Sequence, residues 1–396
     1  MTVHALPSGF RYAATASGIK KSNKLDLALI VSEPPAHCAG VFTRNQVIAA
    51  PLQVTRPRIA GGRCQAILVN SGNANACTGT AGVHIAEQTG ALAASALGVE
   101  QHLIALASTG VIGVPMPLSP FEHSIPQLVA DLQSDGIEAV ARAMMTTDAF
   151  SKIASAKEQG DESYSLLGLA KGAGMIHPDM ATMLCFVMTD ANLQSDLLQK
   201  LLERAVADSF NSITVDGDTS TNDTVMLLAN GAAGGSVIVE GSRAAAVFEQ
   251  HLRRIMLDLA KMIVRDGEGA TKVVQIRVVG AKDVMAARTA ARSVATSALV
   301  KTAFFGEDAN WGRIIAAVGY SGIELDQGRI DISFDDIPIV VGGLALGPQS
   351  EERASAVLKK DSFNVTVNLH MGNAEASYYT SDLNYEYIKI NADYRT

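Results

Sequence analysis

The chain has 396 residues, of which 48% are hydrophobic and 18% charged, and its formal net charge is −8. This balance excludes a disordered or fibrous protein, and the length predicts a globular protein with more than one core-forming unit. The 32 lysines and arginines are scattered along the chain. They do not form the basic stripe of a nucleic-acid-binding protein, so we exclude that class.

The N-terminal residues contain no apolar segment of the kind that directs secretion. No run in the chain approaches the ~20 apolar residues that a membrane-spanning helix needs. The four cysteines, at positions 38, 64, 77 and 185, show no Cys-x-x-Cys spacing and no neighbouring histidine at ligand spacing. We therefore expect free, buried thiols in a cytoplasmic protein, without a metal site and without a membrane partner.

Elements of both kinds are predicted along the first third of the chain. Short apolar runs separated by glycine and proline predict β-type structure at 25–32, 39–55 and 65–72. Residues 82–98 have helical spacing, which places Ile85, Leu92 and Ala96 on one face.

Further along the chain, residues 195–210 predict an amphipathic helix with Ser195 as its N-cap, and residues 243–264 predict a second. Alternating patterns predict strands at 330–341 and 364–372. The mixture predicts an α+β (mixed α/β) fold in which helices cover packed sheets. The polar stretch 151–163 is the expected break between compact units.

Residues 166–191 are the most unusual segment. Loop residues 171–180 (KGAGMIHPDM) run directly into an apolar strand pattern at 182–189 (TMLCFVMT). Thr182 therefore places a hydroxyl at the start of a buried strand, behind the small residue Ala181. Such a hydroxyl can attack the preceding carbonyl, and hydrolysis of the ester frees an α-amine with an ordinary pKa of about 8, able to act as its base. The pattern by itself favours a plainer interpretation, in which Thr182 simply begins a strand.

The segment KGAGMIHPDMATML resembles the processing site of the ornithine acetyltransferase/glutamate N-acetyltransferase family. The resemblance extends over nearly the whole chain, in ordered blocks at 8–30, 39–51, 66–79, 107–113, 210–225, 264–272, 306–322 and 390–396. It implies a layered sandwich with helices outside packed sheets and an autoprocessing enzyme of the N-terminal-nucleophile type.

The resemblance implies autocatalytic cleavage between Ala181 and Thr182. An α fragment (1–181) would carry the oxyanion hole, and a β fragment (182–396) would carry the nucleophile and a substrate-binding C-terminal part. Thr182 would take the acetyl group from Nα-acetylornithine, release ornithine, and pass the acetyl group to glutamate. The resemblance implies no cofactor and leaves open whether acetyl-CoA is a second donor. It also implies a cytoplasmic heterotetramer of two α and two β fragments.

The blocks that resemble the family also imply which residues form the site. Thr109 and Gly110 would form the oxyanion hole, where a glycine lets backbone N–H groups approach without a side chain in the way. The substrate contacts implied are Lys171 for a carboxylate, Glu268 for an ammonium group, Thr146 or Thr147, whose register stays open, and Asn391 and Thr396 near the C-terminus.

Other polar residues are interpreted as structural. His177 is not needed as a base if the freed amine supplies one, and Trp311 is expected to pack. The acidic segment 213–223 (ITVDGDTSTND) could suggest a metal, but we favour a rigid turn network near the nucleophile. Asp179 replaces the asparagine of many relatives, which leaves the preferred acetyl donor open.

Two alternatives remain from the sequence. One is a related amidohydrolase of the same nucleophile type, which would release the acyl group to water. The other is an unprocessed binding protein that keeps the fold without chemistry. An intact polypeptide after purification would favour the second alternative.

Overall fold

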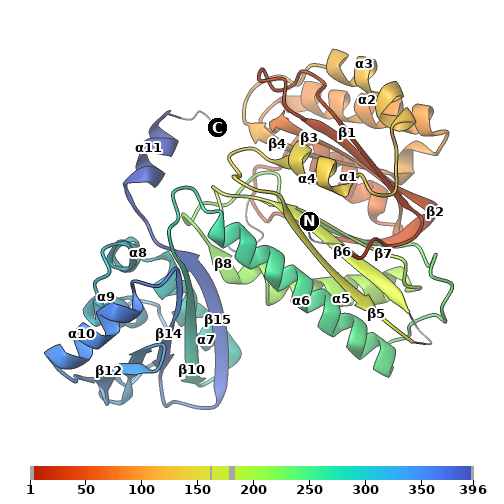
Figure 1. Cartoon of the computed structure of the whole chain (residues 1–396). Coiled ribbons are helices and arrows are strands. Elements are labelled where there is room, and N and C mark those ends of the chain that lie inside the picture. Colours follow the sequence, from red (N-terminus) through yellow and green to blue (C-terminus); the bar gives the residue numbers. More distant parts are fainter. Residues whose placement is uncertain (1–3, 161–162, 178–182, 394–396) are drawn as a thin grey trace.

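The computed structural model describes residues 4–160, 163–177 and 183–393. The predicted cleavage pair, Ala181 and Thr182, lies outside the described residues, as do Asp179 and Thr396. The described elements form two sheets with helices packed on them, which confirms the α+β layered class (Figure 1).

The first sheet has eight strands in the order β4-β3-β2-β9-β7-β6-β5, with β1 paired to β2. Its strands are β1 (Phe10–Thr15), β2 (Leu27–Phe42), β3 (Arg63–Asn73), β4 (Ile104–Val111), β5 (Lys152–Glu158), β6 (Tyr164–Lys171), β7 (Leu184–Thr189) and β9 (Thr224–Ala229). All six residues of β7 are buried. Cys185 and Val187 belong to one core while Leu184 and Phe186 belong to another, so the strand is apolar on both faces.

Helices cover both faces of this sheet. One core includes residues of α5 (Ser195–Ala207) and α6 (Arg243–Arg265). A second includes residues of α4 (Ile137–Met144), and a third those of α1 (Ala50–Ile59), α2 (Gly79–Leu97) and α3 (Ser119–Ala130). None of the helices in the described part of the chain is both long and apolar enough to cross a bilayer.

The second sheet has the order β13-β12-β11-β14-β10-β15-β8. Its strands are β8 (Ile213–Thr214), β10 (Val273–Ala281), β11 (Asp331–Phe334), β12 (Ile337–Val341), β13 (Leu344–Ala345), β14 (Ser362–Asn368) and β15 (Ala374–Ser381). It is accompanied by α7 (Val284–Thr296), α8 (Ala298–Phe305), α9 (Trp311–Gly319) and α10 (Pro348–Val357). Helix α11 (Tyr385–Asp393) extends from this unit back towards the first (Figure 1). Short 3₁₀ turns lie at Gln101–Leu103, Phe210–Ser212 and Gln327–Arg329.

The compact units do not divide at the predicted cleavage site. Strand β6 lies before that site and β7 after it, and they pair antiparallel from Lys171 opposite Leu184 to Leu166 opposite Thr189. Strand β9 pairs with β2 as well as with β7. The first sheet therefore contains strands of both predicted fragments, whereas the second unit has its own core, built from residues between Val274 and Tyr378.

Three local predictions are wrong. Residues 151–163 do not separate two units, because β5 and β6 form a continuous hairpin from Lys152 opposite Ala170 onwards. The strand expected at 39–55 ends at Phe42, and α1 begins at Ala50 with a proline in its first turn. Ser195 does not cap α5. Its hydroxyl donates instead to the carbonyl of Gly62 at 2.6 Å.

Candidate active site

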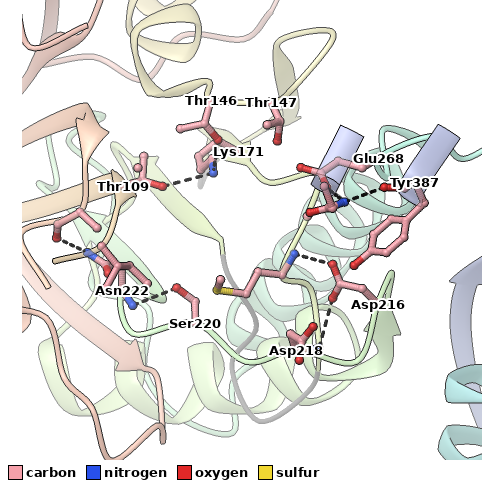
Figure 2. Close-up of a pocket in the computed structure, with 16 residues that line it drawn as sticks. Thr109, Thr146, Thr147, Lys171, Asp216, Asp218, Ser220, Asn222, Glu268 and Tyr387 are labelled. Atoms are coloured by element: carbon pink, nitrogen blue, oxygen red, sulfur yellow. Dashed lines mark hydrogen bonds between the residues drawn. The ribbon is translucent and has the colours of Figure 1, made fainter. Parts of the chain in front are cut away.

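Seven of the predicted site residues line one cavity of about 220 Å³, a size that suits a ligand no larger than an amino acid (Figure 2). They come from the end of β4, the segment after α4, the end of β6, the residues after α6, and α11. The seven are Thr109, Gly110, Thr146, Thr147, Lys171, Glu268 and Asn391. Five stretches distant in sequence therefore converge on a single site.

The oxyanion-hole candidates lie where β3 and β4 end side by side. The ladder is irregular at this point, with a register shift after Gly72 opposite Gly110. Gly110 has a φ of 132°, and a Cβ there would lie 2.4 Å from the carbonyl carbon of Gly72. Only glycine fits, so the backbone faces the cavity without a side chain.

Lys171 is the one basic residue among the described residues that line the cavity. It is 3% exposed, and its Nζ donates to Thr146 Oγ1 at 2.9 Å and to Thr109 Oγ1 at 3.3 Å (Figure 2). Burial lowers the pKa of Lys171, while the carboxylates of Asp148, Asp223 and Glu268 act in the opposite direction. Thr146 thus contacts the lysine directly, whereas Thr147 lines the cavity wall.

A buried ion cluster behind Lys171 fixes the wall of the cavity. Lys152 is fully buried; its Nζ contacts Asp148 at 2.7 Å and also pairs with Asp266. Asp148 accepts hydrogen bonds from the amides of Thr146 at 2.9 Å and Gly172 at 2.7 Å. Although burial acts against ionisation, the nearby lysines hold the pKa of Asp148 below its ordinary value. Sequence analysis missed this cluster.

The opposite wall carries acidic groups. Asn391 on α11 donates to Glu268 Oε2 at 2.8 Å and to the carbonyl of Tyr387 at 3.0 Å. The amide of Glu268 donates to Ala173 at 3.0 Å. A Cβ on Gly174 would lie 2.5 Å from the Glu268 carboxylate, so a larger residue here would displace that side chain. Helix α11 therefore closes the site through Asn391.

The segment predicted as a turn network is part of the site itself. Asp216 accepts from the amides of Met175 at 2.5 Å and Ile176 at 2.9 Å, and burial raises the pKa of Asp216 to about 6. Sequence analysis also missed the lining residues Asp218, Ser220, Asn222 and Tyr387. Within the described residues, no group of three or more His, Cys, Asp or Glu is placed to hold a metal.

The start of β7 is anchored beside this cavity. The amide of Met183 donates to Asp223 Oδ1 at 2.9 Å, and the amide of Thr224 donates to the Met183 carbonyl at 3.1 Å. Asp223 is fully buried, and burial raises its pKa well above the ordinary value. Met183 directly follows Thr182 in the chain. Two contacts therefore fix the residue to which the predicted nucleophile is bonded.

His177 and Trp311 do not line the cavity in the described part of the chain. The buried His177 has Nε2 2.9 Å from Arg292 Nη2 and Nδ1 3.5 Å from Thr214 Oγ1. Trp311 begins α9 and packs against the second core, with Nε1 donating to Glu351 at 3.3 Å. Both positions fit structural roles.

The fold, and a cavity in which backbone at Gly110 is uncovered and a lysine faces a carboxylate, fit the class of acyl-transferring enzymes. The model of the ArgJ family matches residues 11–396. Arginine biosynthesis bifunctional protein ArgJ of Syntrophotalea carbinolica is 58% identical over 98% of this chain and 99% of its own length. Its counterpart in Geobacter sulfurreducens is 52% identical over the same shares. The chain belongs to the ArgJ family.

One solved relative is the crystal structure of arginine biosynthesis bifunctional protein ArgJ from Bacillus halodurans. It is 46% identical to this chain, with a TM-score of 0.51. The match covers 98% of the solved polypeptide but only 53% of this chain. The polypeptide in that crystal is thus about half as long as the chain described here.

Proposed function

We propose that the enzyme moves an acetyl group from Nα-acetylornithine to glutamate through an ester on Thr182. The family assignment, with relatives named for arginine biosynthesis at up to 58% identity, supports this activity. The Thr182 hydroxyl oxygen bonds to the acetyl carbonyl carbon, the amide C–N bond breaks, and the proton passes through the α-amine of Thr182 to the leaving nitrogen. Glutamate then takes the acetyl group by the reverse sequence of steps.

The observation that carries the proposal is the charge arrangement of the cavity. Lys171 and Glu268 lie on opposite sides of the cavity (Figure 2), and Gly110 is a further lining residue. An amino-acid carboxylate would pair with Lys171, while Glu268 would hold an ammonium group. Both substrates carry the same α-carboxylate, so one cavity can hold each in turn.

The proposed maturation is a cut between Ala181 and Thr182. Residues 182–396 make up about 54% of the chain. The match with the solved Bacillus halodurans polypeptide includes 98% of that polypeptide but only 53% of this chain. A polypeptide of about half the chain's length supports a family member that is processed into two polypeptides. The pairing of β6 with β7 and of β2 with β9 would hold the fragments together after cleavage.

Intact-mass spectrometry of the purified protein, with and without acetylornithine, tests the proposal. We expect two fragments divided before Thr182 and an adduct of about 42 daltons, one acetyl group, on the second fragment. The variant Thr182→Ala should remain one polypeptide and transfer nothing. Cleavage of this variant at the same bond would contradict the mechanism. Comparing acetylglutamate formation with acetate release separates a transferase from an amidohydrolase, which the comparisons do not favour.

We also place the enzyme in the cytoplasm as a heterotetramer of two α and two β fragments. The cysteines at positions 38, 64, 77 and 185 are all unpaired, which fits a reducing compartment. Apolar side chains exposed on α11, Tyr385 at 79% and Ile388 at 64%, offer a surface that association would cover. Light scattering coupled to size-exclusion chromatography measures the assembly. A mass of one α and one β fragment would contradict it.

A further inference from the structure

Asp223 is a fully buried carboxylate beside the residues that line the active-site cavity. Ser220 and Asn222 line that cavity, whereas Asp223 is not among the described residues that do. Its Oδ1 accepts the amide of Met183 at 2.9 Å. Its Oδ2 is also buried and has no hydrogen-bond partner among the described residues. One oxygen of this carboxylate is therefore bonded and the other is left without a donor.

A buried oxygen without a donor is costly, because no hydrogen bond replaces the one that it loses to water. The groups near Asp223 do not supply that bond. The Thr43 hydroxyl has a single proton and donates it to the carbonyl of Ser220 at 2.7 Å. Burial raises the pKa of Asp223, and Lys171 acts in the opposite direction. Among the described residues, however, Lys171 Nζ donates to two threonine hydroxyls and to no carboxylate. A further donor is therefore expected at Oδ2.

Two neighbouring strands fix the position of this carboxylate. Asp223 directly precedes β9, and its carbonyl accepts the amide of Thr43, at the end of β2, at 3.0 Å. The next residue, Thr224, pairs with Leu184 of β7 and donates its amide to the Met183 carbonyl at 3.1 Å. The side chain is thus held at the start of β7. A fixed acceptor needs no reorganisation when positive charge develops beside it.

The chain itself supplies a donor at this point once it is cut. Thr182 directly precedes Met183, and three covalent bonds separate their backbone nitrogens, so the two nitrogens are at most about 4 Å apart. A cut before Thr182 turns the first of these nitrogens from an amide into an α-amine, which becomes a cation when it takes up a proton. A carboxylate that holds the Met183 amide through Oδ1 can present Oδ2 to this amine.

We propose that Asp223 Oδ2 accepts a hydrogen bond from the α-amine of Thr182, which makes Asp223 a positioning residue for the base of the acetyl transfer. The inference rests on the function proposed above. During acetylation the Thr182 hydroxyl oxygen bonds to the acetyl carbonyl carbon, and the hydroxyl proton moves to the α-amine. The amide C–N bond of the donor breaks, and the leaving nitrogen takes that proton from the ammonium group. Asp223 orients the amine and stabilises the charge that it carries between these two proton transfers.

The variant Asp223→Asn tests this role. Its side-chain oxygen can keep the bond from Met183, while an NH2 group replaces the free oxygen with a donor. We expect the rate constant for acetylation of Thr182 at saturating acetylornithine, followed by intact mass in a single turnover, to fall at least about tenfold at about pH 9. The matched control is Asp190→Asn. Asp190 follows the other end of β7, is 4% exposed and accepts two backbone amides, at 2.7 and 2.8 Å. This control should acetylate at the wild-type rate.

The pH profile of the same rate constant separates positioning of the amine from a loss of structure. Acetylation needs the neutral amine, so the rate rises as the pH passes the pKa of the amine, ordinarily about 8. Without a carboxylate to stabilise the ammonium form, this pKa should fall by at least about 1. Wild type and Asp223→Asn should therefore differ less at about pH 6 than at about pH 9. Saturating acetylornithine removes the contribution of Lys171 and Glu268, which we assign to substrate binding. An equal loss at every pH, or a wild-type rate at about pH 9, would overturn the inference.

A second measurement applies if Asp223→Asn does not cleave. The uncleaved variant Thr182→Ala has no α-amine, so Oδ2 has no amine to accept from. In this background Asp223→Asn should leave the temperature of unfolding unchanged or raise it. A lowered temperature of unfolding would make Asp223 a structural residue of the precursor and would overturn the inference. Absence of the acetyl adduct from the wild type would instead contradict the function proposed above, so the two failures are distinguishable.

Discussion

Replacing Lys171 with methionine tests the charge arrangement of the active site. Methionine is close to lysine in length but provides neither charge nor donor. The lysine is 3% exposed and bonds to Thr146 and Thr109, so a substrate carboxylate would meet it away from bulk water. A charged hydrogen bond of this kind contributes about 1.5–3 kcal/mol, which predicts a loss of about 10- to 150-fold in kcat/KM.

The loss should appear with both acetylornithine and glutamate, because each presents the same carboxylate. Stability should also fall, because methionine leaves the buried carboxylate of Asp148 without one of its two lysines. Steady-state kinetics and thermal unfolding measure the two effects. Lys157→Met, at an exposed position on β5, is the matched control. A loss below threefold for both substrates would refute the assignment of Lys171.

The same lysine predicts a pH dependence. Because burial lowers the pKa of Lys171, its charge is lost at a lower pH than that of an ordinary lysine, whose pKa is 10.5. The KM for each substrate should therefore rise on the alkaline side before pH 10.5 is reached. In Lys171→Met this rise should disappear, and a rise that persists would assign the titration to another group.

Three further substitutions test the surrounding walls. Gly110→Ala places a Cβ 2.4 Å from Gly72. The rate constant of acetylation, measured under single-turnover conditions, should fall at least about 100-fold. An unchanged rate constant would remove Gly110 from the oxyanion hole. Asn391→Ala loses a 2.8 Å bond to Glu268 and should raise KM about 3- to 10-fold at constant kcat; a fall in kcat alone would contradict this. Burial raises the pKa of Asp216 from 3.8 to about 6, so the stability that its protonation contributes is present below pH 4 and is lost as the pH rises through 6. The unfolding free energy of Asp216→Asn relative to wild type should therefore rise by about 2 kcal/mol between pH 4 and pH 7, and a constant difference would argue against this titration.

Sequence patterns predicted the elements with strong periodicity. Helices α5 and α6 and the buried strand β7 lie close to the predicted positions. The prediction for residues 82–98 found the helix and part of its packed face, because Ile85 and Leu92 pack against the core. Ala96 is exposed, whereas Gly90 is buried. A Cβ added at Gly90 would lie 2.5 Å from the guanidinium of Arg58. Close helix packing selects small residues there, and a periodicity of large apolar residues cannot reveal it.

The site residues came from matching motifs, and the structure shows what motifs cannot supply. The bond between Lys171 and the Thr146 hydroxyl spans 25 positions of sequence, so no motif could reveal it. The pairing of Lys152 with Asp266 spans 114 positions, so no local pattern signals it. Asp216 did carry a local signal, because an Asp in a turn often accepts the amide two residues on, as Asp216 does from Asp218 at 3.2 Å.

The position of β6 beside β7 in the sheet has a consequence for how the enzyme matures. Taken alone, each half of the chain would form only part of the first sheet. Apolar strands such as β6 and β7 would then lack the neighbouring strand with which they pair. Neither half can then reach its native form before the other, so the cleavage proposed before Thr182 would have to take place inside a molecule that has already folded. Such a cut would leave the strand order unchanged, and the proposed precursor would be a zymogen that sheds no segment.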